Sequence, residues 1–151
     1  MPDQCVKQTY VLFLGGEIED GYTIKKLARG SQHENHFIAC GVVDKELVPH
    51  YYEQGNAVAL MSLSEGFGLS LIEGMHFGLP CMTFTDVDAF DDIFDERAMV
   101  GVNNHSDEAV AKGLEQLLTN KWKKELIKTY SKKFEPENMA EKYVEVYKRE
   151  V

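Results

Sequence analysis

Two glutamates, Glu65 and Glu73, lie eight residues apart and enclose a short segment with two glycines. The segment reads Gly66-Phe67-Gly68-Leu69-Ser70 and leads into a predicted helix. The first turn of a helix has backbone N–H groups without intrahelical partners, and with the helix dipole they favour an anion such as a phosphate. Glycine lets a ligand approach the backbone closely, and carboxylates accept hydrogen bonds from sugar hydroxyls. The pattern therefore predicts a ligand with both hydroxyls and phosphates, which is a nucleotide sugar.

A predicted strand, a helix and a second strand position these glutamates. The first strand is the apolar run Ala57–Leu63, which is typical of a strand buried on both faces of a parallel sheet. The helix covers Leu69–Phe77, and the next buried strand is Cys81–Thr85. Small residues recur every fourth position and would let one helix face lie close against the sheet: Ser70, Gly74 and Gly78. Gly78 also stands where a left-handed helix stop is expected.

The rest of the chain alternates strands with helices. Further strands are predicted at Thr9–Leu14, His36–Cys40 and Met99–Val102, and helices at Tyr22–Arg29, Lys45–Gln54, Glu108–Leu118, Lys121–Lys133 and from Pro136 onward, with one helical turn around Asp91–Phe94. Asp44 and either Ser106 or Asp107 are the expected helix caps. This alternation predicts an α/β, three-layer Rossmann-like domain with a five-stranded parallel sheet, helices on both faces and two C-terminal helices.

Length and composition predict one globular domain over residues 1–151. The net charge of −9 argues against nucleic acid as a general partner. No run approaches the roughly 18 apolar residues of a membrane span, and residues 1–4 begin no signal peptide, so we expect a cytoplasmic protein. The three cysteines are odd in number and far apart, as expected for reduced thiols.

The segment Ser62–Met75, followed by Gly78-Leu79-Pro80, resembles the E-x7-E signature of retaining GT-B glycosyltransferases. It is most similar to glycosyltransferase family 4, also called the glycosyl transferases group 1 domain. In that family the first Glu (here Glu65) and the Gly-Phe-Gly backbone face the donor sugar, the helix start faces the diphosphate, and the second Glu (here Glu73) holds the ribose. The resemblance extends over about residues 9–145.

The resemblance implies the donor-binding domain of a retaining hexosyltransferase, which moves a hexose from a nucleotide diphosphate sugar to a glycan or a lipid-linked acceptor in polysaccharide biosynthesis. Glu65 would position the sugar as the catalytic residue. The donor-binding residues would be Gly15, Gly16, Gly66, Phe67, Gly68, Leu69, Ser70 and Glu73. The family requires no cofactor and no metal, and it often works at the inner face of a membrane.

Several family features are not found in this sequence. The family's C-terminal half begins with an earlier strand and helix, whose Arg and Lys grip the donor diphosphate, and an acceptor-binding domain precedes it. We therefore expect this chain alone to be inactive and to need the N-terminal domain in cis or in trans. In addition, Asp88-Ala89 stands where the family usually has Gly-Gly, and Asp92 stands where it has Glu.

The missing strand leads to a prediction about the sheet. Deleting the first strand from the order 3-2-1-4-5-6 leaves, after renumbering, the order 2-1-3-4-5. The strands at 9–14 and 57–63 would then pair directly, and Gly15-Gly16 would lie opposite Glu65–Gly68. If these strands do not pair, we expect another chain to fill the gap.

The sequence leaves two other functional hypotheses open. The chain could be a non-catalytic nucleotide-binding or assembly module that kept the fold, which the missing Arg and Lys favour. The third hypothesis, which the sequence favours least, is a sugar-nucleotide epimerase, because epimerases share the fold but not this motif. A metal site at His33 and His36 is disfavoured because further ligands are not evident. The aromatic residues of the last two helices form either core or a surface that packs on the N-terminal domain.

Overall fold

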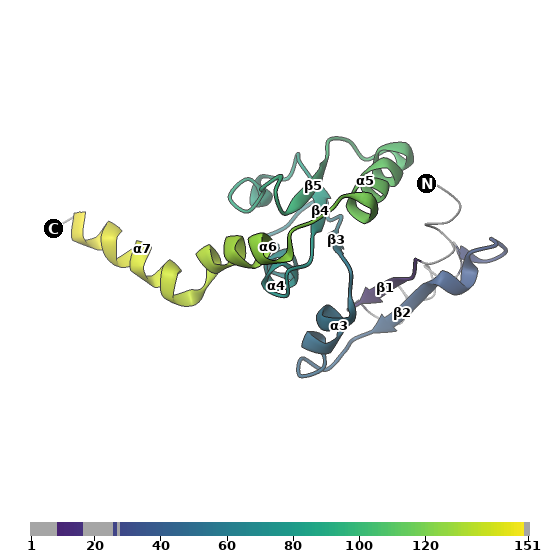
Figure 1. The fold of residues 1–151 in the computed structure, drawn as a ribbon, viewed down its shortest axis with the longest axis horizontal. Helices are drawn as coiled ribbons and strands as arrows, with labels where there is room; N and C mark the ends of the chain where they lie inside the picture. Colours follow the sequence, from purple (N-terminus) through teal and green to yellow (C-terminus); the bar gives the residue numbers. More distant parts are fainter. Residues whose placement is uncertain (1–8, 17–25, 27, 150–151) are drawn as a thin grey trace. The chain divides into compact units, whose positions relative to one another are not determined.

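The computed structural model describes residues 9–16, 26 and 28–149. The chain divides into two compact units, residues 1–51 and 52–151, and each is considered by itself. The predicted helix at Tyr22–Arg29 and the acidic stretch before it lie mostly outside the described residues, as does Cys5. Both units have parallel strands joined through helical segments, so the fold is α/β and Rossmann-like (Figure 1).

The first unit contains a two-stranded parallel sheet. β1 (Val11–Leu14) pairs with β2 (Phe37–Gly41), and Val11 lies opposite Phe37. β1 ends at Gly15 and Gly16, which have φ angles of 92° and 75°. These left-handed conformations suit glycine because it has no Cβ, so the pair ends the strand as the sequence predicts.

The helix that follows β2 in the chain, α3 (Val48–Gln54), begins three residues later than predicted. Residues 45–47 form a turn instead, in which the Leu47 N–H donates to the Asp44 carbonyl at 2.9 Å. The predicted side-chain cap by Asp44 is therefore wrong. Pro49 explains the later start, because proline lacks an N–H and is tolerated only in the first turn of a helix.

The second unit is built on a three-stranded parallel sheet in the order β3-β4-β5 (Figure 1). Its strands are β3 (Val58–Leu60), β4 (Cys81–Phe84) and β5 (Met99–Val102). All four residues of β4 are buried, as expected for a central strand. β5 has the predicted bounds, whereas β3 is shorter than the apolar run that predicted it.

Helices cover both faces of this sheet. On α4 (Leu69–His76), a Cβ added to Gly74 would lie 2.5 Å from Val58 and 3.7 Å from the Cys81 sulfur. On α5 (Asp107–Thr119), a Cβ added to Gly113 would lie 3.0 Å from the Met82 sulfur. Cys81 and Met82 are consecutive on β4 and so point to opposite faces, which places α4 on one face and α5 on the other.

The predicted close packing of α4 is only partly right. Gly74 does lie against the sheet, and Gly78 has a φ of 79° and forms the predicted helix stop. However, a Cβ on Gly78 would meet Lys124 rather than the sheet, and Ser70 is exposed. Two glycines therefore allow close approach, but to two different elements.

Three further helices complete the second unit. α5 has Ser106 as its cap, because the Ser106 hydroxyl accepts a hydrogen bond from the Ala109 N–H at 3.2 Å. α6 (Lys124–Ser131) continues into the short 3-10 turn η3 (Lys132–Phe134), and α7 (Pro136–Arg149) begins at the predicted proline. No helix in the described part of the chain is long and apolar enough to cross a bilayer.

The predicted sheet order 2-1-3-4-5 is corrected by the structure. Among the described residues, β1 pairs only with β2 and β3 pairs only with β4, so the five strands form two sheets rather than one. β1 belongs to the first unit and β3 to the second, and the strands pair through backbone hydrogen bonds only within each unit.

Candidate functional site

The loop between β3 and α4 contains most of the predicted donor site. It follows the carboxyl end of β3, which is where ligands bind in open parallel α/β sheets. Within it, Glu65 is half-buried and its carboxylate pairs with no described residue. Gly66 is exposed, and a Cβ added there would meet nothing within 4 Å. The first half of the loop is therefore open and has an unpaired carboxylate.

Gly68 is held in place by close packing. It is buried, has a φ of 77°, and a Cβ there would lie 2.7 Å from the Phe90 ring and 3.3 Å from Ile93. Both neighbours belong to the buried core. Protein thus fills the space where a Cβ of Gly68 would lie, whereas the same space at Gly66 is open, and the ligand approach expected at both glycines stays a prediction.

Phe67 also packs against protein. Its ring meets Phe134 edge-on with 6.2 Å between the ring centres, and it lines a groove of about 350 Å³ next to α7. If Phe67 contacts a nucleotide-sugar donor, as predicted, we expect the contact to be made by its backbone, because its ring packs against protein.

The start of α4 exposes backbone donors. Leu69 and Ser70 are both exposed, and their N–H groups donate to no described residue, whereas the Leu71 N–H bonds the Gly68 carbonyl at 3.0 Å. Two free N–H groups at the positive end of a helix are suited to an anion. The structure thus gives this helix start the free donors that the sequence predicts.

Glu73 is joined to a residue that the sequence analysis did not assign to the site. The Tyr52 hydroxyl on α3 donates to Glu73 Oε2 at 2.9 Å and lies 3.4 Å from the Ser70 carbonyl. Burial raises the pKa of Tyr52, and the hydrogen bond and charge of Glu73 raise it further. A tyrosine shortly before β3 was an unspecific signal for this contact, because Tyr51 stands there as well. In the sequence, however, such a tyrosine is also compatible with simple packing.

Asp88, Ala89 and Asp92 stand where the resembled family has glycines and a glutamate. Asp88 and Ala89 form the short turn η2 (Asp88–Phe90); Asp88 is exposed, and Ala89 packs on the core. Asp92 is exposed and its carbonyl accepts from Lys133 at 3.4 Å. These side chains therefore add negative charge at the surface of the second unit.

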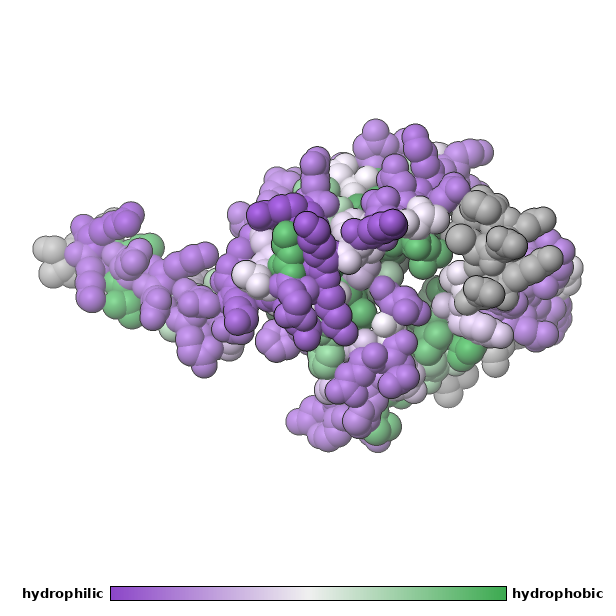
Figure 2. Space-filling model, in the orientation of Figure 1, coloured by the Kyte–Doolittle hydropathy of each residue, from purple (hydrophilic) through white to green (hydrophobic). Residues whose placement is uncertain are grey.

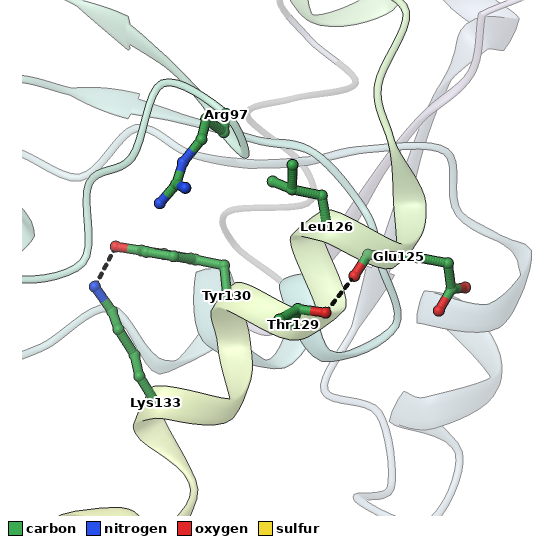
Figure 3. Close-up of a pocket in the computed structure, with 6 residues that line it drawn as sticks. All are labelled: Arg97, Glu125, Leu126, Thr129, Tyr130 and Lys133. Atoms are coloured by element: carbon green, nitrogen blue, oxygen red, sulfur yellow. Dashed lines mark hydrogen bonds between the residues drawn. The ribbon is translucent and has the colours of Figure 1, made fainter.

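A cavity of about 510 Å³ lies elsewhere in the second unit (Figure 3). Two cations of this cavity lie over the Tyr130 ring: the Arg97 guanidinium is 5.9 Å from the ring centre, and the Lys133 ammonium is 3.9 Å from the same centre in a cation–π contact. The Tyr130 hydroxyl bonds the Ile93 carbonyl at 3.1 Å and also pairs with Lys133, while Asp95 pairs with Arg97 at 2.8 Å. Because Arg97, Thr129, Tyr130 and Lys133 already pair with protein groups, we interpret this cavity as structural.

Gly15 and Gly16 belong to the first unit, so their predicted position opposite Glu65–Gly68 stays a prediction. The described residues include no group of three or more metal-ligating side chains. Of the two histidines considered and disfavoured as metal ligands, His36 makes structural contacts: its Nδ1 lies 2.7 Å from the Thr9 carbonyl, and its ring stacks on Tyr10. His36 thus holds the residues that precede β1 next to the residue that begins β2.

Comparison with known proteins gives one family and several similar folds. The family model described as "Glycosyl transferases group 1" matches residues 2–134. No curated protein sequence is significantly similar to the chain.

Three similar solved structures illustrate the fold. The lipopolysaccharide outer core galactosyltransferase WaaB, in its apo form, is 16% identical with a TM-score of 0.69, over 96% of this chain and 51% of that one. The sucrose-phosphate synthase of Thermosynechococcus elongatus is 22% identical with a TM-score of 0.70, over 91% and 37%. WaaG, a glycosyltransferase involved in lipopolysaccharide biosynthesis, is 16% identical with a TM-score of 0.67, over 87% and 34%. This chain thus spans about half or less of the length of each of these three proteins.

Proposed function

Because this chain belongs to the glycosyl transferases group 1 family, we propose that it is the donor-binding portion of a retaining glycosyltransferase of family 4. The complete enzyme would transfer a hexose from a nucleotide diphosphate sugar to a glycan or lipid-linked acceptor, as in polysaccharide biosynthesis. The main supporting observation is the start of α4, whose free N–H groups at Leu69 and Ser70 follow the unpaired carboxylate of Glu65.

Each group of this site has a proposed role. The two N–H groups bind the diphosphate and stabilise the negative charge that grows on it as the sugar leaves. Glu65 positions the sugar hydroxyls, and the open space at Gly66 leaves room for the sugar ring. Glu73, one turn further along α4, accepts hydrogen bonds from the ribose. No cofactor or metal is needed in this scheme.

Titration calorimetry with UDP, GDP and ADP tests this proposal. We expect at least one of the three to bind, and Glu73→Ala to abolish or strongly weaken that binding. Glu96→Ala is a matched control, because it removes an exposed glutamate outside this loop. Absence of binding to all three nucleotides would refute donor binding and favour the alternative, a non-catalytic assembly module that kept the fold.

The proposed partner is the acceptor-binding domain, in cis or in trans. α7 has an apolar stripe that the second unit does not cover (Figure 2). Tyr143, Val146 and Tyr147 are 63%, 55% and 70% exposed, and Val146 and Tyr147 lie on the face of Tyr143 because they follow it by three and four residues. Large exposed apolar patches mark interaction sites, so we assign this stripe to the acceptor domain.

Two expectations follow for the isolated chain. It should turn over no donor in the presence of acceptor, and measurable transfer by the purified 151-residue protein would refute this. We also propose a cytoplasmic location, with contact to the inner face of the membrane only through the acceptor domain. Cell fractionation of the isolated chain tests this, because recovery in the membrane fraction would contradict it.

A further inference from the structure

One face of α4 is held by a tyrosine of α3. Ser70, Glu73 and Phe77 are three and four residues apart, so they lie on the same side of α4. Tyr52 contacts all three: its hydroxyl reaches the Glu73 carboxylate at 2.9 Å and the Ser70 carbonyl at 3.4 Å, and its ring stacks on Phe77. The two rings are 5.5 Å apart and tilted by only 19°, which fixes where the hydroxyl points.

This contact determines how Glu73 presents its carboxylate. An exposed glutamate without partners samples several rotamers, and ordering it on ligand binding costs entropy. The hydrogen bond from Tyr52 engages Oε2, so the carboxylate is held before any ligand arrives. Oε1 then keeps its full capacity to accept hydrogen bonds, and Oε2 keeps one lone pair.

The hydroxyl of Tyr52 is also a dependable donor. Burial and the neighbouring Glu73 raise the pKa of the phenol, so it stays protonated at neutral pH. A hydrogen bond to an ionised acceptor is stronger than one between neutral groups. The contact therefore persists under the conditions in which a donor nucleotide would bind.

We infer that Tyr52 is a positioning residue for nucleotide binding, which orients Glu73 so that its free lone pairs accept hydrogen bonds from ribose hydroxyls. This inference rests on the proposed function, since it requires that Glu73 binds ribose. It adds a residue from outside the motif, 21 positions earlier in the chain. The competing interpretation is that Tyr52 acts only through its ring, as a packing partner of Phe77.

Tyr52→Phe separates these interpretations because it removes the hydroxyl and keeps the ring. The binding test uses whichever of UDP, GDP and ADP binds best, together with its 2′,3′-dideoxy counterpart. We expect Tyr52→Phe to weaken the ribonucleotide by about 3- to 10-fold, the loss of one hydrogen bond, and the dideoxynucleotide much less. The preference for ribose should therefore fall. Tyr51→Phe is the control, because it removes the neighbouring hydroxyl on the same helix.

Equal weakening of both nucleotides, or no weakening of either, would overturn the inference, because a packing role does not distinguish ribose from its dideoxy form. If the wild-type chain binds none of the three diphosphates, the proposed function fails and the inference fails with it. If the wild type binds and Tyr52→Phe keeps the ribose preference, the inference alone fails.

A second measurement needs no nucleotide. The unfolding free energies of wild type, Tyr52→Phe, Glu73→Ala and the double variant form a thermodynamic cycle, which can be followed by the fluorescence of Trp122, the single tryptophan. We expect the two substitutions to be non-additive, because the side chains share one hydrogen bond. Strict additivity would show that the contact does not form in solution and would overturn the inference, whatever the nucleotide titrations show.

Discussion

Substitution of Gly68 by alanine tests whether the start of α4 is fixed by packing. Gly68 has a φ of 77°, and an alanine in this left-handed conformation costs about 1–2 kcal/mol. The added Cβ would also lie 2.7 Å from Phe90, which is 2% exposed, and overpacking a buried site costs about 1–3 kcal/mol. We therefore expect Gly68→Ala to lower the free energy of unfolding by about 2–5 kcal/mol.

Gly66→Ala is the matched control in the same loop. Gly66 does not have a positive φ, and a Cβ there would meet nothing within 4 Å. Where alanine fits the native backbone, it restricts the unfolded chain and leaves stability unchanged or raises it by up to about 1 kcal/mol. The two substitutions are chemically identical, so the difference between them measures the local environment alone.

Urea unfolding followed by Trp122 fluorescence gives the free energies. Trp122 suits this purpose because its indole N–H bonds the Leu117 carbonyl at 2.8 Å and its ring packs on the core of the second unit. Gly68→Asn serves as a second variant, because asparagine tolerates the left-handed region and so isolates the clash. In a Phe90→Leu background, which makes room for the Cβ, Gly68→Ala should cost less.

Two results would refute this reasoning. If Gly68→Ala and Gly66→Ala unfold at the same urea concentration with the same slope, the packing at Gly68 is not as described. If the cost of Gly68→Ala is unchanged in the Phe90→Leu background, the contact with Phe90 is not its cause, and backbone strain alone explains the loss.

Three further predictions concern other parts of the second unit. Ser106→Ala should destabilise by about 1 kcal/mol, because the Ala109 N–H loses its cap, whereas Ser106→Asp should restore stability in urea unfolding; equal stability of all three proteins would contradict the cap. The hydrogen bonds from Arg97 lower the pKa of Asp95 in the folded protein. The pair therefore stabilises the fold fully above the ordinary Asp pKa of about 3.9, and this stabilisation is lost as the pH falls through the lower pKa of the folded state. The difference in unfolding free energy between wild type and Asp95→Asn should therefore shrink in acid, and a constant difference from neutral pH to acid would contradict this. Ending the chain at Glu135 should change the urea midpoint little, because α7 has no buried residue, and a large loss of stability would show that α7 packs on the unit.

Local signals in the sequence correctly determined several features. The Ser106 cap, the Gly78 stop, the Pro136 start and the bounds of β5 all follow from interactions within about four residues of chain, and the structure confirms each. The family assignment also came from a contiguous segment. The glycines and glutamates between 65 and 78 led to the group 1 family, and the family model that matches residues 2–134 confirms that broader assignment.

The contacts that complete the site depend on residues far apart in the chain, and only the tertiary structure gave them. Nothing in the local sequence indicates that Phe90, which follows the carboxyl end of β4, fills the space beside Gly68. Tyr52 reaches Glu73 across 21 residues, and no local pattern indicates which tyrosine of α3 would do so. The sheet order could not be predicted for the same reason: strands pair through backbone hydrogen bonds between residues far apart in the chain, and the structure pairs them as β1-β2 and β3-β4-β5.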